Sequence, residues 1–157
     1  MKNKKRSTVL RIVAVLLVAA MVMPLPVSAA VAEEVAPCAS YYLTSYNTYI
    51  YPAAWGKIQV WFTVTGVDDM DDIGVLKILL YESTDGGETW TWIKSYSHDL
   101  DEGMLGHDDF YHSGHVEYQG TIGRYYQAYV YIWAGRDGDG DARYMWTQPK
   151  KASLFAA

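Results

Sequence analysis

The stretch KIQVWFTVTG, residues 57–66, indicates the fold class of this chain. Ile58, Val60, Phe62 and Val64 would share one face of an extended chain, and mostly polar residues would fall on the other. This period of two is typical of a strand that buries one face. The stretch therefore predicts a half-buried β-strand.

Similar runs flank this stretch on both sides. GVLKILLYES, residues 74–83, is apolar on both faces and predicts a central strand, whereas the polar residues 97–114 predict a long loop. No window of eleven residues carries a helical period. We expect an all-β fold: a single immunoglobulin- or fibronectin-like β-sandwich of about seven antiparallel strands. The strands are expected near residues 42–51, 57–66, 74–83, 89–96, 115–120, 124–135 and 142–148.

One tyrosine supports this fold class. Tyr126 follows a glycine-containing turn and is in phase with the apolar residues of GTIGRYYQAYVYIWAG, residues 120–135. In immunoglobulin-like domains a tyrosine at this place, the tyrosine corner, hydrogen-bonds to upstream backbone. A simple barrel could use the same pattern.

The amino terminus predicts export. Five bases precede IVAVLLVAAMVM, residues 12–23, and small residues follow it, as in a helical secretory signal peptide. We expect a signal peptide over 1–30, a flexible leader over 31–40, the β-sandwich over 41–150 and a C-terminal tail over 151–157. Cys38 is the single cysteine, so it would be a free thiol or form an intermolecular disulfide. The mature protein would be secreted and would not insert into a membrane.

The charge of the mature chain excludes one class of partner. Eight of the 13 bases and all 18 acids follow residue 30, which gives a net charge of −10. Because this charge repels phosphate backbones, we expect no nucleic-acid partner.

Residues 83–90, STDGGETW, match the Asp-box pattern. Its defining residues are Ser83, Asp85, Gly87, Thr89 and Trp90. Asp85 can accept backbone N–H groups in a turn, and the glycines tolerate positive φ. Proteins with this motif, including sialidases, use it structurally, and a single copy in a chain this short cannot build a propeller. We interpret the box as a structural hairpin.

The chain as a whole resembles a family of small exported bacterial proteins catalogued as a domain of unknown function. The segments that carry the resemblance are YNTYIYPA, KIQVWFTVTG, LYESTDGGETWTWIK and YQGTIGRYYQAYVYIWAG, within residues 41–147. The resemblance implies secretion and a compact β domain. It provides no catalytic residues to transfer.

Two groups of residues resemble sets of metal ligands. Asp137, Asp139 and Asp141 resemble the start of an EF-hand loop, but Ala142 and Gln148 occupy the places of its glycine and glutamate. An acidic hairpin turn is the favoured interpretation, with weak Ca²⁺ binding as the alternative. The second group consists of three histidines: His107, His112 and His115. A solvated loop is the favoured interpretation for them, and a zinc site is the alternative. No other cofactor is expected.

Aromatic residues give the main functional hypothesis. If the Tyr126 face is core, Tyr129, Tyr131 and Trp133 project from the opposite face. In a sandwich the neighbouring strands of that sheet would carry Leu79 and Tyr81, and Tyr144 and Trp146, and of these we take Tyr81 and Tyr144 as candidate site residues. Outward aromatic rows often mark binding surfaces, unless another segment covers them. We expect a non-catalytic surface or protein-interaction module. The alternatives are a carbohydrate-binding module and, third, a small secreted hydrolase.

The signal peptide leads to a first prediction. The secreted protein should begin between Ala30 and Glu33, because small residues precede the cut. Intact-mass spectrometry of the exported protein checks this boundary. Recovery of the full-length chain in the membrane fraction would contradict it.

Overall fold

The structure is a computed structural model, and it describes residues 40–156. The expected signal peptide, most of the leader and Cys38 lie outside these residues. The described part of the chain is all-β apart from one short 3₁₀ turn. Within it, no helix has the length and apolarity needed to cross a membrane.

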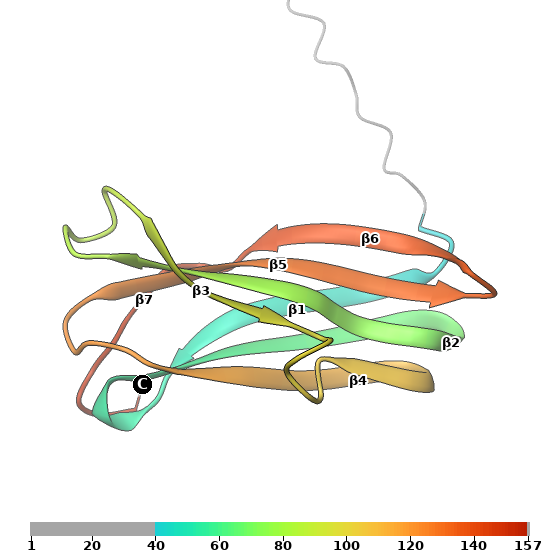
Figure 1. Ribbon diagram of the computed structural model, residues 1–157, viewed down its shortest axis with the longest axis horizontal. Helices are drawn as coiled ribbons and strands as arrows, with labels where there is room; N and C mark the ends of the chain where they lie inside the picture. The colour runs from blue at the N-terminus through green and yellow to red at the C-terminus, as the bar shows by residue number, and fades with distance from the viewer. Residues whose placement is uncertain (1–39, 157) are drawn as a thin grey trace, which may run out of the picture. The chain divides into compact units, whose positions relative to one another are not determined.

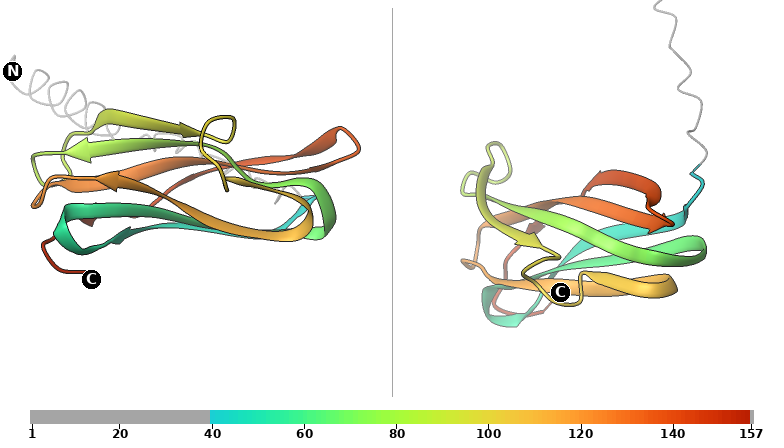
Figure 2. Two further views of the ribbon diagram at one scale, coloured as in Figure 1. Left: turned by 60° about the horizontal axis from the view of Figure 1, so that its bottom comes forward. Right: turned by 45° about the vertical axis from the view of Figure 1, so that its right-hand side comes forward.

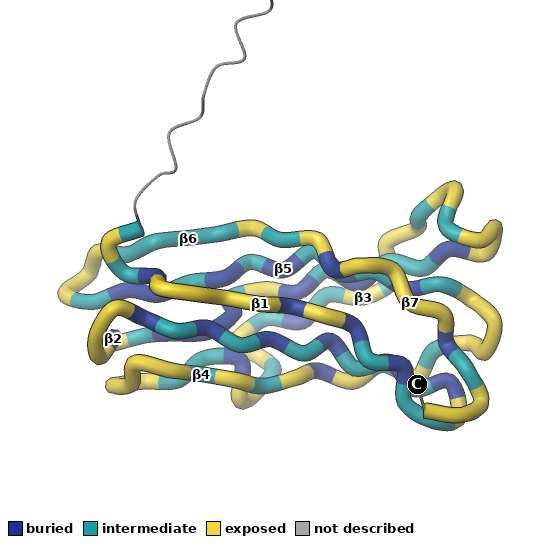
Figure 3. Tube along the Cα trace, turned by 180° about the vertical axis from the view of Figure 1, so that it is seen from behind, coloured by how far each residue is buried: buried dark blue, intermediate teal, exposed yellow. Residues whose placement is uncertain are grey.

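Seven antiparallel strands form one strongly curled sheet (Figure 1). Figure 3 shows that buried and half-buried residues alternate along much of β2 and β5, the two central strands. In chain order the elements are β1 (Leu43–Pro52), η1 (Ala54–Gly56), β2 (Lys57–Ser83), β3 (Thr91–Ser97), β4 (Leu105–Gln119), β5 (Tyr125–Arg136), β6 (Asp139–Trp146) and β7 (Lys150–Lys151).

The 27-residue strand β2 links the two halves of this sheet. Its first part, up to Thr65, pairs with β1 on one side and with the end of β4 on the other. Its last part pairs with β5 over Asp72–Ser83 and with β3 over Lys77–Glu82. We call these the β1 half and the β5 half; β6 extends the β5 half at its edge. Figure 2 shows how β2 and β4 curl together so that the halves face each other.

The curl occurs where β2 has extra residues. Thr65 lies opposite Tyr111 of β4, but the next pair joins Met70 to Asp109. Four residues of β2, 66–69, therefore lie opposite a single residue of β4. Extra residues on one strand bend it and increase its twist, which is what turning a corner requires.

A glycine allows the strands to approach closely just after the corner. Gly74 has φ of 144°, a value that L side chains rarely adopt, and a Cβ there would collide with the carbonyl oxygen of Met104. That carbonyl accepts the N–H of Val75 at 2.8 Å. This contact holds the β3–β4 connection against β2, and the side chain of Met104 is buried in the core.

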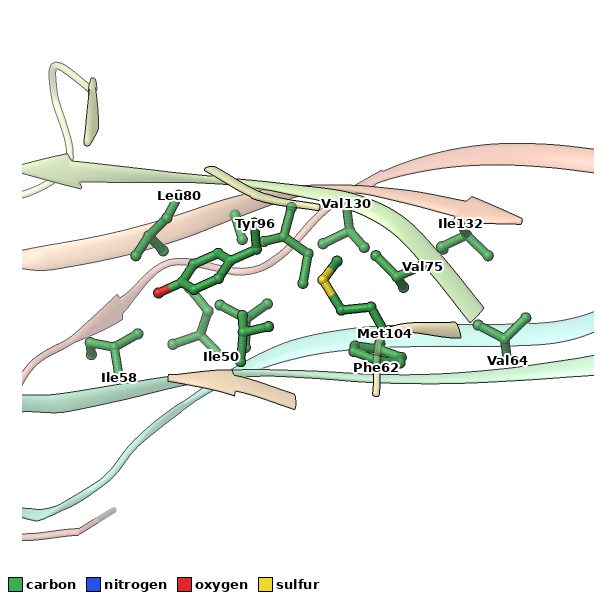
Figure 4. Close-up of a cluster of buried hydrophobic side chains, with 14 of the residues drawn as sticks. Ile50, Ile58, Phe62, Val64, Val75, Leu80, Tyr96, Met104, Val130 and Ile132 are labelled. Atoms are coloured by element: carbon green, nitrogen blue, oxygen red, sulfur yellow. The ribbon is translucent and has the colours of Figure 1, made fainter. Parts of the chain in front are cut away.

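The core fills the space between the two halves (Figure 4). Side chains of both halves and of the connecting segment meet there, and those labelled in Figure 4 are Ile50, Ile58, Phe62, Val64, Val75, Leu80, Tyr96, Met104, Val130 and Ile132. A hydrogen bond also crosses the core, because the Tyr96 hydroxyl of β3 donates to the carbonyl oxygen of Glu117 in β4 at 2.7 Å. Burial raises the pKa of Tyr96 to about 12, so this hydroxyl keeps its proton for donation.

The structure confirms an all-β fold of seven antiparallel strands and the central position of residues 74–83. It differs from the expected sandwich because the seven strands belong to one strongly curled sheet and not to two sheets. Residues 57–66 and 74–83 are parts of one strand, which passes through both halves. The long loop expected over 97–114 is wrong from Leu105 onward, where β4 begins. Polar residues suit this strand because most of its first part is exposed.

The end of the chain also packs onto the fold. Lys150 and Lys151 pair with the start of β5, and Ala152 is buried. The N–H of Ala152 donates to the carbonyl of Arg124 at 2.9 Å, and Leu154 accepts the N–H of Trp55. Residues 152–154, expected as tail, therefore help to fix the β4–β5 connection and η1.

The core predicts which β2 substitution is costly. Phe62→Ala should lower the free energy of unfolding by about 3–5 kcal/mol, because it leaves a cavity between the two halves. Asn47→Ala, on the exposed face of β1, is the control and should change it by less than about 0.5 kcal/mol. Urea denaturation followed by circular dichroism measures both. Equal effects of the two substitutions would contradict this placement of the core.

Candidate functional site

The outward face of the β5 half carries the expected aromatic side chains. Along β5 the buried residues alternate with half-buried ones, and Tyr129, Tyr131 and Trp133 are in the half-buried set. Their neighbours follow from strand pairing: Tyr129 lies opposite Trp146 and Tyr131 opposite Tyr144 of β6. Cross-strand partners project from the same face of a sheet.

Four of these rings and that of Tyr81 in β2 form a continuous group, the outer aromatic cluster: Tyr81, Tyr129, Tyr131, Tyr144 and Trp146. The Trp146 ring centroid lies 4.7 Å from that of Tyr129 and 5.2 Å from that of Tyr81. Tyr131 stands edge-on to Tyr129 and to Tyr144, at 5.2 and 4.9 Å. These tilted and edge-to-face geometries are the favourable ones for aromatic pairs, so contacts among the rings stabilise the cluster on the surface of the sheet.

The cluster is accessible and its polar atoms are free. Tyr144 is 58% exposed and Trp146 50% exposed. Within residues 40–156 the tyrosines whose hydroxyls hydrogen-bond to protein atoms are Tyr42, Tyr96 and Tyr126, none of which belongs to the cluster. The one buried side-chain polar atom without a partner in these residues is Thr48 Oγ1, so the cluster hydroxyls are not sealed away from solvent.

Trp133, expected in the same row, lies apart from the cluster. Its outward direction agrees with the expected alternation, but its ring covers the backbone of the β5–β6 hairpin. A Cβ at Gly135 or Gly140 would come within 2.7 or 2.5 Å of that ring. Trp133 therefore packs on two glycines, with no cluster ring as its partner.

Two tryptophans of this face were not among the expected site residues: Trp146, which was expected only as a residue of a neighbouring strand, and Trp92, which was not expected here. Trp146 could have been placed by the turn: Asp137 and Gly138 form a two-residue hairpin loop with positive φ at both positions, which fixes the β5–β6 register. Trp92 of β3 lies opposite Tyr81 and is 58% exposed. A bulge beside Tyr81 determines the direction of the Trp92 side chain, and the sequence pattern does not predict that bulge.

The β1 half carries a smaller aromatic group on its own outer face, the Trp61 stack: Tyr49, Trp61 and His115. These rings lie on three neighbouring strands, and the Trp61 ring centroid is 4.3 Å from that of His115 and 6.4 Å from that of Tyr49. Polar neighbours already engage this group, because Trp61 Nε1 donates to Gln59 at 3.1 Å. Glu117 accepts from both Gln59 and Lys57, which lowers its pKa.

The Asp-box residues form a hydrogen-bonded hairpin between β2 and β3. Asp85 accepts the hydroxyls of Ser83 at 2.6 Å and Thr89 at 2.5 Å, and also the N–H groups of Glu88 and Thr89. These hydrogen bonds, that of Ser83 first, hold the pKa of Asp85 well below its usual range. Ser83 Oγ accepts the N–H of Gly87, and the Trp90 ring lies over that glycine. Every defining residue of the box thus contacts the turn itself.

Tyr126 is fully buried beneath this end of the sheet. Its hydroxyl accepts the N–H of Thr121, five residues upstream, at 2.8 Å and donates to Glu82 at 2.5 Å. Burial raises its pKa to about 12, and the neighbouring Glu82 adds to that effect. Arg124 pairs with the other oxygen of Glu82 at 2.6 Å.

The three aspartates proposed for calcium have separate contacts. Asp137 lies in the hairpin turn and its N–H donates to Asp71, while Asp139 accepts the N–H of Gly140. Asp141 accepts the Ser40 hydroxyl at 2.5 Å and two N–H groups at 2.8 and 3.0 Å, and these bonds lower its pKa. Asp141 thereby anchors the start of the described chain to β6.

The histidines are also separate. His107 pairs with Asp72 at 2.7 Å, His112 contacts the carbonyl of Gly103 at 2.9 Å, and His115 stacks on Trp61. Among residues 40–156 no three His, Cys, Asp or Glu side chains are grouped as ligands of a metal ion.

Comparisons with known proteins add little. No protein-family model matches the sequence, and no curated protein is similar to it. One solved structure, a family 76 glycoside hydrolase from a bovine Bacteroides thetaiotaomicron strain, shares 11% identity over 68% of this chain and 20% of its own, with a TM-score of 0.29. A likeness this distant carries no argument.

The Asp-box predicts a pH-dependent contribution to stability. Because the folded state lowers the pKa of Asp85, the carboxylate stabilises the fold above the unfolded pKa of about 3.9, and this contribution disappears as the pH falls toward the folded value. Asp85→Asn should therefore lower the urea midpoint at pH 7 and have progressively less effect below pH 4.

Glu88→Gln, an exposed change in the same loop, is the matched control and should leave the midpoint unchanged at each pH. Urea titrations of the three proteins between pH 3 and pH 7 measure these differences. An Asp85→Asn effect that is absent at pH 7, or equally large at pH 3, would show that the hydrogen bonds do not act as described.

Proposed function

We propose that this protein is exported, does not catalyse a reaction, and binds a partner outside the cell through the outer aromatic cluster. The observation that carries the proposal is the cluster itself: five mutually packed rings on the outward face of β2, β5 and β6, with Tyr144 and Trp146 half exposed or more. Tyrosine and tryptophan dominate binding hot spots because they combine large apolar area with a polar group.

The charge of the surrounding face supports the choice of this cluster over the Trp61 stack. At the outward positions of β2, β5 and β6 around the cluster, the charged residue is Lys77. The Trp61 stack lies beside Lys57, Glu117 and Gln59, which hydrogen-bond among themselves. On a binding surface whose polar atoms have no partner in the protein, each of these atoms can hydrogen-bond to a ligand without breaking a bond within the protein.

The carboxyl groups support binding over hydrolysis. A general acid in a glycosidase needs a raised pKa. The carboxyl groups with a shifted pKa in residues 40–156 are Asp68, Asp85, Glu117 and Asp141, and each is lowered by hydrogen bonds. Such groups remain ionised and suit structural roles.

For the class of fold, we propose a relationship to immunoglobulin- or fibronectin-like sandwiches. The hydrogen bond between the Tyr126 hydroxyl and the backbone of Thr121 supports it. The continuity of β2 through both halves is the main departure from that class.

Trp146→Ala tests the proposed surface. The protein should retain its fold, losing about 1 kcal/mol or less of stability, because the ring is half exposed on an edge strand. The affinity of the purified protein for envelopes of the cells that produce it should fall about thirtyfold, as expected for the loss of a hot-spot residue. Co-sedimentation with washed envelopes gives the affinity.

Trp61→Ala is the matched control, since it removes a tryptophan from the opposite outer face and should leave retention unchanged. If Trp61→Ala abolished retention and Trp146→Ala did not, the ligand surface would lie on the β1 half and the proposal would be wrong.

A further inference from the structure

We infer that the partner of the aromatic surface is a neutral polysaccharide chain, which lies across the strands from Trp92 to Tyr144. This inference rests on the proposed function and gives its ligand a chemical class. Three properties of the surface carry it: the linear order of the rings, the free polar atoms, and the near absence of charge.

The rings form a row that crosses four strands. Trp92 of β3 lies opposite Tyr81 of β2, and Tyr81 contacts Trp146 of β6, which contacts Tyr129 of β5. Since β3, β2, β5 and β6 are successive neighbours, the strands that carry the rings span three strand spacings, about 14 Å. A row of this length and direction suits an extended chain of several rings rather than one small molecule.

Trp92 is directed to this row by a local irregularity. The pairing of β2 with β3 shifts between Leu80 and Tyr81, and this bulge places Trp92 opposite Tyr81. Trp92 Nε1 donates to the carbonyl of Lys94 at 3.1 Å, which fixes the indole, and the residue as a whole is 58% exposed. A fixed and exposed ring is suited to stacking, because little side-chain entropy is lost on binding.

The polar atoms favour a ligand rich in hydroxyl groups. The hydroxyls of Tyr81, Tyr129, Tyr131 and Tyr144 are free of protein partners in the described part of the chain. Each can both donate and accept a hydrogen bond, and the aromatic faces offer apolar contact. Sugar rings present apolar C–H faces and peripheral hydroxyls, so they match both properties at once.

The lack of charge selects a neutral ligand. The charged residues at outward positions of the surrounding strands are Lys77 of β2 and Lys151 of β7, which lies over the ring of Tyr125, outside the cluster. Lys94 turns away, over the ring of the inward-facing Tyr96 at 5.4 Å. A chain of sugar acids or sulfated sugars would need several cations to offset its desolvation. A protein partner is the alternative occupant, and the experiment below separates the two.

Native affinity electrophoresis tests the inference with defined probes. The purified protein is run in gels that contain β-1,3-glucan, xylan, galactomannan or dextran, with polygalacturonate as the anionic contrast. At least one neutral polysaccharide should retard the protein, and polygalacturonate should not. Trp92→Ala should lower the affinity for that polysaccharide, calculated from the retardation, about tenfold or more, as loss of a stacking ring does.

Trp55→Ala is the matched control, because Trp55 is 73% exposed but belongs to η1, between β1 and β2. It should be retarded like the wild-type protein, and circular dichroism checks that both variants are folded. Failure of all four neutral probes, or equal retardation of Trp92→Ala and wild type, would overturn the inference.

The proposed function is judged separately by envelope retention of Trp146→Ala. If that variant lost retention while material eluted from the wild-type protein contained protein and no sugar, the aromatic surface would be a binding site for a protein. The polysaccharide inference would then be wrong and the proposed function would stand.

Discussion

The fold depends on one strand that takes part in both halves of the sheet. β2 pairs with β1, β3, β4 and β5, so the strands of each half are positioned through it. Its direction changes where residues 66–69 lie opposite a single residue of β4, and Gly74 then lets the β3–β4 connection approach. Without that corner the inward side chains of the two halves could not face each other, and the sheet would leave an apolar surface open to water.

The corner also organises the charge of the molecule. Carboxylates gather there and at the adjoining β5–β6 turn: Asp137 N–H bonds to Asp71, and Arg136 pairs with Asp68. The described chain carries 16 acids and eight bases. Because much of the negative charge lies at loops and corners, the outer face of the β5 half can remain almost uncharged while the protein keeps a net charge that favours solubility.

Much of the fold could be predicted from the sequence, because strict alternation in 57–66 and 125–134 determines which side chains are buried. The same alternation placed Tyr129 and Tyr131 outside. The features that it could not provide depend on contacts distant in sequence. The continuity of β2 requires a bulge that only β4 defines, and the strand at 105–114 has too few apolar residues to be recognised. Trp92 joins the aromatic row through another bulge, whereas the outward position of Trp146 could have been derived from the Asp137–Gly138 turn, whose signal is local.

The shared strand makes the two outer faces thermodynamically dependent on each other. A ligand on the β5 half stabilises every conformation in which β2 is intact, and β2 cannot be intact on one side of the corner alone without exposing the core. Amide hydrogens of β1 and β4, far from the aromatic row, would therefore exchange more slowly with solvent when the row is occupied. A backbone probe on the opposite face can thus report binding at a surface that it does not touch.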